Sequence, residues 1–174
     1  MQYFDRNRRA NKNQAISYRI VTDLRDLPFL IQLAKEAHNE SRFSYIEFSP
    51  EKVEKIARRA LNDPKQKAIM LACNESYPVG FAYCSVGEYH IGRGVLITTI
   101  HNINVSQDVR AGLSGGRIAL SLFKGIETWS RARGAKEVLL HVTSDVNLAR
   151  AHKLAKRMGY RFIGGSYVKN TETA

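Results

Sequence analysis

The sequence predicts one domain of class α/β or α+β, in which helices cover both faces of a mixed β-sheet. The 174 residues are 44% hydrophobic and 25% charged, which suits a soluble chain with a single core of ordinary size. Strand-like and helix-like segments follow one another in the order β-α-α-β-β-β-α-β-α-β. Neither internal repeats nor low-complexity tracts interrupt that order.

The first residues lack the apolar periodicity of the rest of the chain. Residues 1–16 hold four basic side chains and one acid, which is typical of a mobile basic arm. We expect one ordered domain over residues 17–170 and a short tail over 171–174. The whole chain has 27 Lys and Arg against 16 Asp and Glu, a net charge of +11. Such a charge attracts phosphates or acidic partners, and the arm is a candidate contact for nucleic acid.

Two helices are expected after an opening strand near Tyr18 and Ile20. A carboxylate followed by a proline in the first turn predicts a helix from Asp26 to about Asn39. Ser49, with a proline and an acid directly after it, predicts the start of the second helix. The apolar residues of this second helix fall on one face: Val53, Ile56, Ala57, Ala60 and Leu61.

Three apolar or β-branched runs predict the next strands. Residues 67–74 and 79–87 flank a turn, which favours an antiparallel hairpin, and residues 95–105 follow. Cys73 and Cys84 lie in the first two runs, and we expect both to be buried, reduced thiols. The chain has no Cys-x-x-Cys and no Cys/His spacing typical of zinc, so we expect no structural metal.

A glycine-rich loop over residues 109–117 is expected to open a long helix that ends at Gly134. Free backbone N–H groups at a helix N-terminus bind phosphate oxygens when bulky side chains are absent. A flexible connector is the alternative, since the loop matches neither a P-loop nor Gly-x-Gly-x-x-Gly. The apolar stripe of the long helix comprises Ile118, Leu122, Ile126 and Trp129.

The remaining residues predict a strand, a helix and a last strand. Residues 136–143 form the first strand, and Asp145 or Asn147 caps the helix that follows. Gly159 stops this helix, and residues 160–168 form the last strand.

No segment of the sequence predicts a membrane span. The longest apolar run, residues 68–73, is far too short to cross a bilayer, and the polar N-terminus has no stretch like a signal peptide. We therefore expect a cytoplasmic protein without membrane contact.

The layout around the glycine-rich loop resembles the GCN5-related N-acetyltransferase superfamily over about residues 17–170. Its most specific segments are the helix end over residues 129–136 and the passage from Ala151-x-x-Leu154 to Met158-Gly159-Tyr160. The resemblance implies a mixed, mostly antiparallel sheet flanked by about four helices. It also implies an enzyme that transfers the acetyl group of acetyl coenzyme A directly to an amine, on a small molecule or a protein, and a homodimer is compatible with it. Small phage-encoded members with a similar Gly-Gly-Arg loop look nearest.

In that family the backbone amides of an Arg/Gln-x-x-Gly-x-Gly/Ala loop hold the coenzyme A pyrophosphate. Residues 114–119 stand in the matching place, where only the last residue fits the pattern and Gly115 and Gly116 supply the open backbone instead. The cofactor contacts implied here are Arg110, Ser114, Gly115, Gly116, Arg117, Ile118 and Ala119, together with Asn147 or Arg150 on the last helix. The resemblance further assigns the backbone of Asn104 and Val105 to the thioester carbonyl.

Catalysis also needs a base for the amine. His101 lies in the strand whose end presents the thioester, and an imidazole with a pKa near 6.5 can accept the proton. Glu88, with His90, is a weaker candidate. Many members of the family donate a proton to the thiolate from a tyrosine, and Ala155 stands there in this chain, so water, Tyr160 or Tyr167 would substitute. The alternative is a binding module with a degraded site, whose basic surface contacts nucleic acid or an acidic protein.

Overall fold

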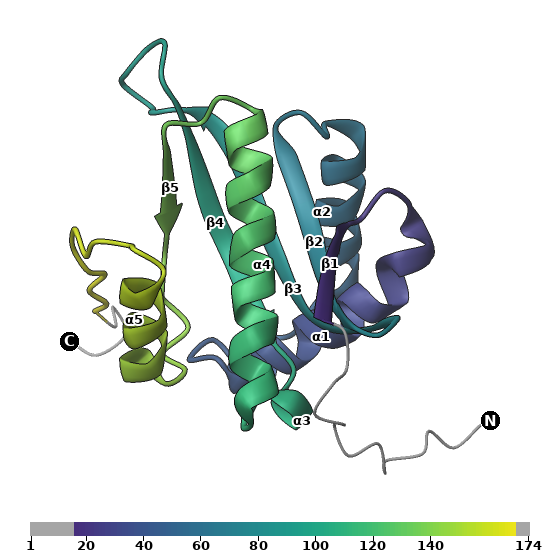
Figure 1. Ribbon diagram of the computed structural model, residues 1–174. Helices are drawn as coiled ribbons and strands as arrows, with labels where there is room; N and C mark the ends of the chain where they lie inside the picture. Colours follow the sequence, from purple (N-terminus) through teal and green to yellow (C-terminus); the bar gives the residue numbers. More distant parts are fainter. Residues whose placement is uncertain (1–15, 170–174) are drawn as a thin grey trace.

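The computed structural model describes residues 16–169, and its centre is a five-stranded sheet (Figure 1). The strands lie side by side in chain order, and the first four are antiparallel while β5 runs parallel to β4. They are β1 (Ile16–Ile20), β2 (Lys67–Asn74), β3 (Tyr77–Glu88), β4 (Leu96–Val105) and β5 (Glu137–Leu140). This confirms the mixed sheet that the sequence pattern predicts and the mostly antiparallel arrangement that the resemblance implies.

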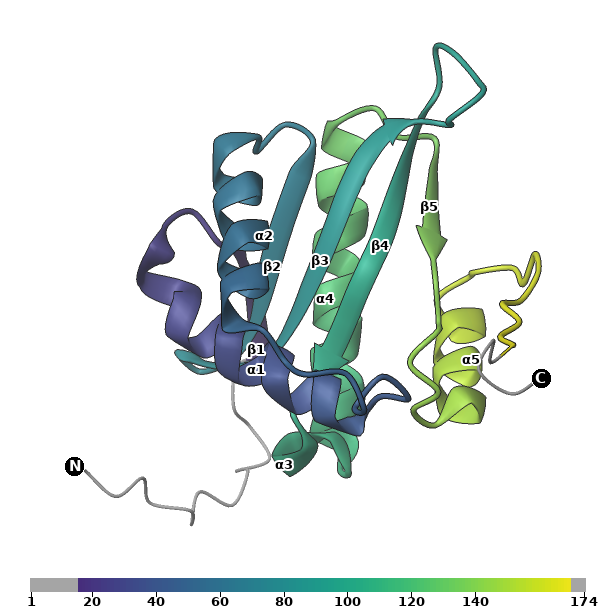
Figure 2. The ribbon, with the colours of Figure 1, turned by 180° about the vertical axis from the view of Figure 1, so that it is seen from behind.

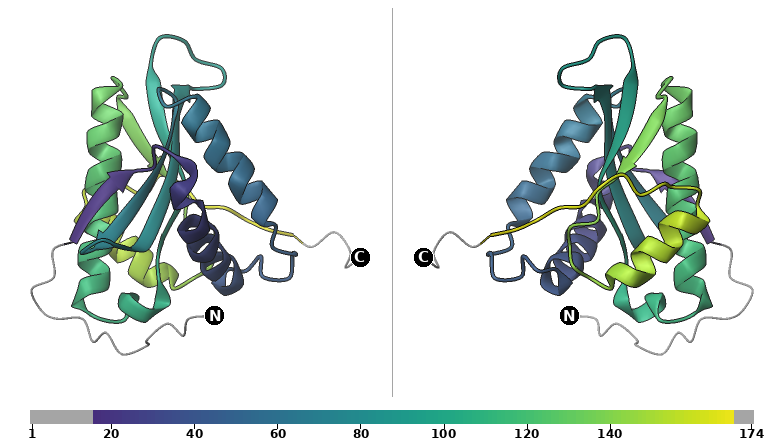
Figure 3. Two further views of the ribbon diagram at one scale, coloured as in Figure 1. Left: turned by 90° about the vertical axis from the view of Figure 1, so that its right-hand side faces the viewer. Right: turned by 90° about the vertical axis from the view of Figure 1, so that its left-hand side faces the viewer.

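Helices cover both faces of this sheet. In Figure 1, α4 lies in front of the strands; seen from behind, in Figure 2, α1 and α2 cover the other face. Figure 3 shows the sheet edge-on between these two layers, with α5 beyond β5. The helices are α1 (Leu27–Glu40), α2 (Pro50–Asn62), α3 (Gln107–Arg110), α4 (Leu113–Ala132) and α5 (Leu148–Arg157), and a short 3₁₀ turn spans Leu24–Asp26.

Local sequence signals explain where α2 and α5 begin and where α4 and α5 end. The Ser49 hydroxyl accepts a hydrogen bond from the Lys52 N–H, as the sequence predicts for α2. Of the two candidate caps of α5, Asn147 is the residue used, since its side chain accepts from the Arg150 N–H. Gly134 and Gly159 follow α4 and α5 with φ of +71° and +84°, a backbone conformation that favours glycine.

Asp26 does not cap α1, although the sequence predicts that it does. Its carboxylate forms an ion pair with Arg19 of β1 instead. The capping carboxylate at this end is Asp23, which accepts from the Arg25 N–H at the start of the 3₁₀ turn. The Arg19 guanidinium offers two parallel donors, and this bidentate geometry favours the pair over a single capping bond.

Two apolar clusters hold the layers together. One lies between the sheet and α4, where Ile118, Leu122 and Ile126 are fully buried and Trp129 is 3% exposed. The other lies between the opposite face and α1 and α2. Cys73 and Cys84 are buried and free, and burial raises the pKa of the Cys84 thiol to about 12. No helix within residues 16–169 is both long and apolar enough to cross a membrane.

Two predicted strands differ from the structure, and the predicted arm and tail fall almost wholly outside the described residues. The strand expected over 160–168 is wrong: these residues form no strand, and Gly164 and Gly165 interrupt it with a φ of +156° at the first of them. The strand expected over 136–143 is shortened to β5. The arm and the tail lie outside the described residues, except that Ile16, expected in the arm, begins β1.

Candidate functional site

β4 loses one of its two neighbours half-way along its length. Pairing with β5 runs from Ile97 opposite Glu137 to Ile100 opposite Leu140 and then stops, while β4 continues to Val105. Pairing with β3 continues to the end of β4. Figure 2 shows β4 and the chain after β5 diverging from this point. We call the unpaired side of residues 101–105 the free edge of β4, because no described strand pairs with it.

The peptide between Asn104 and Val105 directs an N–H group to the free edge. A Cβ atom on Gly80 of β3 would lie 2.8 Å from the Asn104 carbonyl oxygen, so this carbonyl faces β3. A trans peptide places its C=O and N–H on opposite sides, and the Val105 N–H therefore faces away from β3. The Ser106 N–H, which donates to the Val79 carbonyl at 2.8 Å, shows the expected alternation.

A β-bulge places His101 at the point where β5 ends. Tyr83 lies opposite Asn102 and Cys84 lies opposite Ile100, so His101 is the extra residue of β4 in this pairing. Its Nε2 is 2.7 Å from the Ser85 hydroxyl oxygen, and its ring centroid is 4.9 Å from that of Tyr83. Tyr83 packs on the cluster beneath α1 and α2, so the imidazole lies on that face of the sheet.

Two effects keep the His101 imidazole neutral at neutral pH. Its partial burial disfavours the charged form, and nearby His141, just after β5, adds charge repulsion, so the pKa of His101 falls below its ordinary value of 6.5. The residue is exposed to solvent even so. A neutral, accessible imidazole is the form that accepts a proton.

The glycine-rich segment is helical, although the sequence predicts a loop over 109–117. α3 ends at Arg110, Gly112 precedes the first residue of α4, and in the described chain no side chain caps α4. Gly115 is buried, and a Cβ on it would lie 2.5 Å from the Arg110 carbonyl oxygen. A Cβ on Gly116 would meet no described atom within 4 Å. Gly115 thus permits the close approach of α3 and α4, whereas Gly116 leaves open surface beside the first turn.

The comparisons with known proteins agree with this layout. No protein-family model matches the sequence, and no curated protein matches it either. Among solved structures, an aminoglycoside N-acetyltransferase in complex with coenzyme A aligns at 13% identity over 93% of this chain and 98% of its own, with a TM-score of 0.70. A predicted acetyltransferase from Clostridium acetobutylicum with acetyl coenzyme A aligns at 14% identity over 92% and 99%, with a TM-score of 0.67.

A third solved structure, the ribosomal-protein-alanine N-acetyltransferase from Brucella melitensis biovar Abortus 2308, aligns at 18% identity. It covers 90% of this chain and 99% of its own, with a TM-score of 0.65. The chain has the fold of the GCN5-related N-acetyltransferases. In this acetyltransferase fold, the free edge of β4 and the start of α4 lie at the same end of the sheet (Figure 1).

Ion pairs and hydrogen bonds join three helices around that end. The Arg110 guanidinium of α3 lies 2.6 Å from the Glu40 carboxylate of α1. The Arg150 guanidinium of α5 donates to the Arg110 carbonyl at 3.3 Å. The Ser106 hydroxyl donates to the Glu36 carboxylate at 2.9 Å. The acetyltransferase fold therefore brings Arg110 and Arg150, both predicted from the sequence, together beside the first turn of α4.

The other side chains predicted to contact the cofactor differ in their exposure to solvent. The Arg117 side chain is exposed, but Ile118 is fully buried against the sheet, and Ala119 is half-buried against the same cluster. The Asn147 side chain already caps α5. Ser114, in the first turn of α4, is half-buried.

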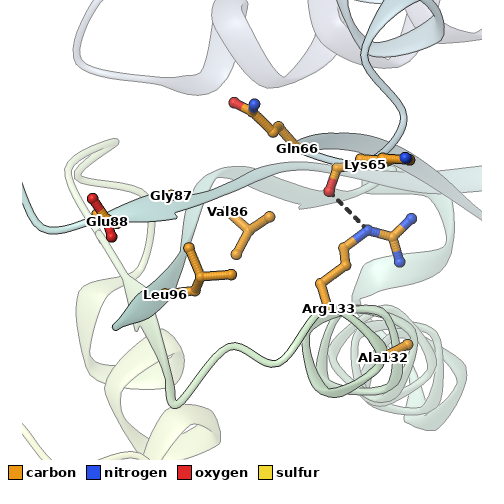
Figure 4. A pocket seen from close by; sticks show the side chains of 8 residues that line it. All are labelled: Lys65, Gln66, Val86, Gly87, Glu88, Leu96, Ala132 and Arg133. Carbon is orange, nitrogen blue, oxygen red and sulfur yellow. Dashed lines mark hydrogen bonds between the residues drawn. The ribbon is translucent and has the colours of Figure 1, made fainter. Parts of the chain in front are cut away.

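Glu88 lies at the other end of β4 from the free edge. It pairs with Leu96, and its carboxylate accepts from the Gly94 N–H at 2.6 Å. It lines a groove of about 740 Å³ beside Arg133, which donates to the Lys65 carbonyl (Figure 4). The fold therefore does not bring Glu88 and His101 together, and His101 is the candidate base at the free edge.

Three residues near the site escaped sequence analysis: Ser85, His141 and Glu36. Each contacts or faces a residue far away in the chain, and no local pattern marks such a partner. The alternation of β3 does place Tyr83 and Ser85 on one face. Their place beneath His101 depends on the register and the bulge, which the sequence does not reveal.

Proposed function

We propose that this protein is an acetyl coenzyme A-dependent N-acetyltransferase that transfers an acetyl group directly to the amine of a bound acceptor. The observation that carries the proposal is the free edge of β4, with the Val105 N–H directed into it and the neutral imidazole of His101 beside it. The similar structures support it, because two of them hold coenzyme A or acetyl coenzyme A, and two are named for acceptors that carry amines.

The residues at this end of the sheet fit such a cofactor. An extended strand edge offers backbone groups to a linear, amide-containing chain, as one strand does to another. The first turn of α4 lacks a capping side chain, Gly116 leaves it open, and the exposed Arg117 adds positive charge for phosphates. The Asn104 side-chain amide nitrogen is buried without a partner among the described residues, so it remains available as a donor.

When bound, acetyl coenzyme A supplies a thioester whose carbonyl carbon gains a bond to the acceptor nitrogen and loses its bond to sulfur. The Val105 N–H donates a hydrogen bond to the carbonyl oxygen, where negative charge develops. His101 accepts the proton that the acceptor nitrogen loses. The first turn of α4 and Arg117 bind the phosphates. The ion pair of Arg110 with Glu40 and the hydrogen bond from Arg150 to the Arg110 carbonyl hold the neighbouring backbone in place.

No tyrosine is needed to protonate the departing thiolate. A thiol has a pKa of about 8.5, so its anion is an adequate leaving group and takes a proton from water. Tyr160 packs its ring on Phe123, and burial raises the pKa of its hydroxyl to about 12. Tyr167 is fully exposed in the segment after α5. Water is therefore the donor we assign.

Binding of acetyl coenzyme A tests the proposal. A ligand that binds only the folded state at 100 times its Kd stabilises it by about 2.7 kcal/mol, which raises the Tm of a chain of this size by roughly 5–10 °C. We expect such a rise in a thermal unfolding scan of the full chain, and a calorimetric titration should give one site per chain. A folded sample that shows neither effect at millimolar ligand contradicts the proposal.

Two glycine variants form a matched pair, in which one tests cofactor binding and the other tests packing. Gly116→Val adds a side chain where there is space, so it should fold normally and weaken binding by about tenfold, or about 1.4 kcal/mol. Gly115→Val pushes against the Arg110 backbone and should lose about 1–3 kcal/mol of unfolding free energy. Unchanged affinity in folded Gly116→Val would remove the first turn of α4 from the site.

A further inference from the structure

We propose that Ser85 is a positioning residue, which holds the His101 imidazole in the tautomer protonated at Nε2 and leaves Nδ1 to accept the proton of the acceptor amine. This inference rests on the proposed function, because it names the nitrogen that acts as the base. Its starting point is the 2.7 Å distance between His101 Nε2 and the Ser85 hydroxyl oxygen.

The hydrogen bond has two possible directions with opposite consequences. A neutral imidazole carries one N–H donor and one acceptor nitrogen, whereas a hydroxyl can donate or accept. If Ser85 donates to Nε2, the hydrogen bond consumes the lone pair and Nδ1 carries the proton, so no nitrogen is free to act as a base. If Nε2–H donates to Ser85, the lone pair of Nδ1 is free. Only the second direction is compatible with His101 as the base.

Proton transfer itself favours the second direction, in which His101 Nε2–H donates to the Ser85 hydroxyl. When Nδ1 accepts a proton, both ring nitrogens become donors, and Ser85 can continue to accept from Nε2–H without turning. That hydrogen bond becomes stronger because its donor is now charged. We therefore expect Ser85 to stabilise the imidazolium more than the neutral ring, an effect opposite to those of burial and of His141, which lower the pKa of His101.

The neighbouring groups fix the ring without competing for its nitrogens. The Tyr83 ring stacks on the imidazole at an interplanar angle of 30°, which restricts rotation of the imidazole. The two acids of α1 near the end of β4, Glu36 and Glu40, are engaged by Ser106 and Arg110. His141 is the titratable neighbour that acts on His101 by charge. Ser85 is therefore the neighbour that decides the tautomer.

Nitrogen NMR of histidine-labelled full chain, without any ligand, tests this directly. Above the pKa of His101, we expect an Nε2 shift typical of a protonated nitrogen and an Nδ1 shift typical of a free lone pair. In Ser85→Ala, the two shifts should move toward the average of both tautomers, and the pKa of His101 should fall further. A protonated Nδ1 in the native chain, or shifts and pKa that Ser85→Ala leaves unchanged, would overturn the assignment.

Kinetics provide a second readout. Ser85→Ala should lower kcat about tenfold with little change in the KM for acetyl coenzyme A, because the hydrogen bond acts on the base and not on cofactor binding. Ser85→Thr keeps the hydroxyl and should restore kcat, and Ser76→Ala, on the exposed β2–β3 turn, is the control. A fall in kcat without any change in tautomer or pKa would show a merely structural role and refute the proposal. Absent activity in the native chain would instead refute the proposed function, and the NMR result would still decide the tautomer.

Discussion

Replacing His101 with alanine is expected to lower kcat by about 10²-fold or more, the usual contribution of a positioned general base. The acceptor amine would then lose its proton to water alone. The side chain is exposed, so the variant should keep nearly the native free energy of unfolding. Single-turnover kinetics with saturating acetyl coenzyme A would isolate the chemical step from cofactor binding.

The dependence of kcat on pH should report the protonation of the same residue, His101. Protonation of the imidazole removes the base, so kcat of the native protein should fall as the pH drops through the pKa of His101, which lies below 6.5. His101→Ala should lose this acidic limb. His90→Ala, in the exposed β3–β4 connection, is the matched control and should behave as the native protein. Full turnover with an unchanged profile in His101→Ala would exclude the base role.

Replacing Val105 with proline is expected to lower kcat by about 10²–10³-fold, as the loss of one donor to a developing oxyanion does. Proline removes the N–H that faces the free edge and no hydrogen bond to β3, so the strand pairing should survive. Val105→Ala is the matched control, because it trims the same buried side chain and keeps the N–H.

The comparison of these two Val105 variants separates the backbone from the side chain. Urea unfolding should show a modest loss of stability in both, since alanine removes two buried methyl groups and the proline ring no longer fills the valine position. Only Val105→Pro should lose turnover. Equal turnover in the two variants would mean that the Val105 N–H contributes nothing to the reaction.

Local chemistry in the sequence predicts the helices well. Ser49 caps α2 with its own hydroxyl, and Gly134 ends α4 in the left-handed conformation, and both signals need only neighbouring residues. The apolar stripe from Ile118 to Trp129 likewise predicts the face of α4 that packs on the sheet. The layered fold follows from such signals.

The site depends on pairings between distant residues, which local patterns do not contain. The free edge exists because β5 stops at Leu140 while β4 continues, and the bulge at His101 is visible only in the register with β3. The glycines at the start of α4 show the same limit, since the family resemblance implies phosphate binding for both. The close Arg110 carbonyl gives Gly115 a packing role. The strand expected over 160–168 is interrupted at Gly164 and Gly165, which the apolar pattern around them outweighs in the sequence prediction.

Titration of isotope-labelled full chain with acetyl coenzyme A, followed by amide NMR, tests most directly whether the free edge of β4 is the cofactor site. Binding there should shift the Val105 and Gly116 amide signals, since one faces the free edge and the other lies in the open first turn of α4. The amide of Glu88, at the opposite end of β4, should stay unchanged. Shifts confined to the groove around Glu88 and Arg133, with Val105 and Gly116 unaffected, would contradict the account.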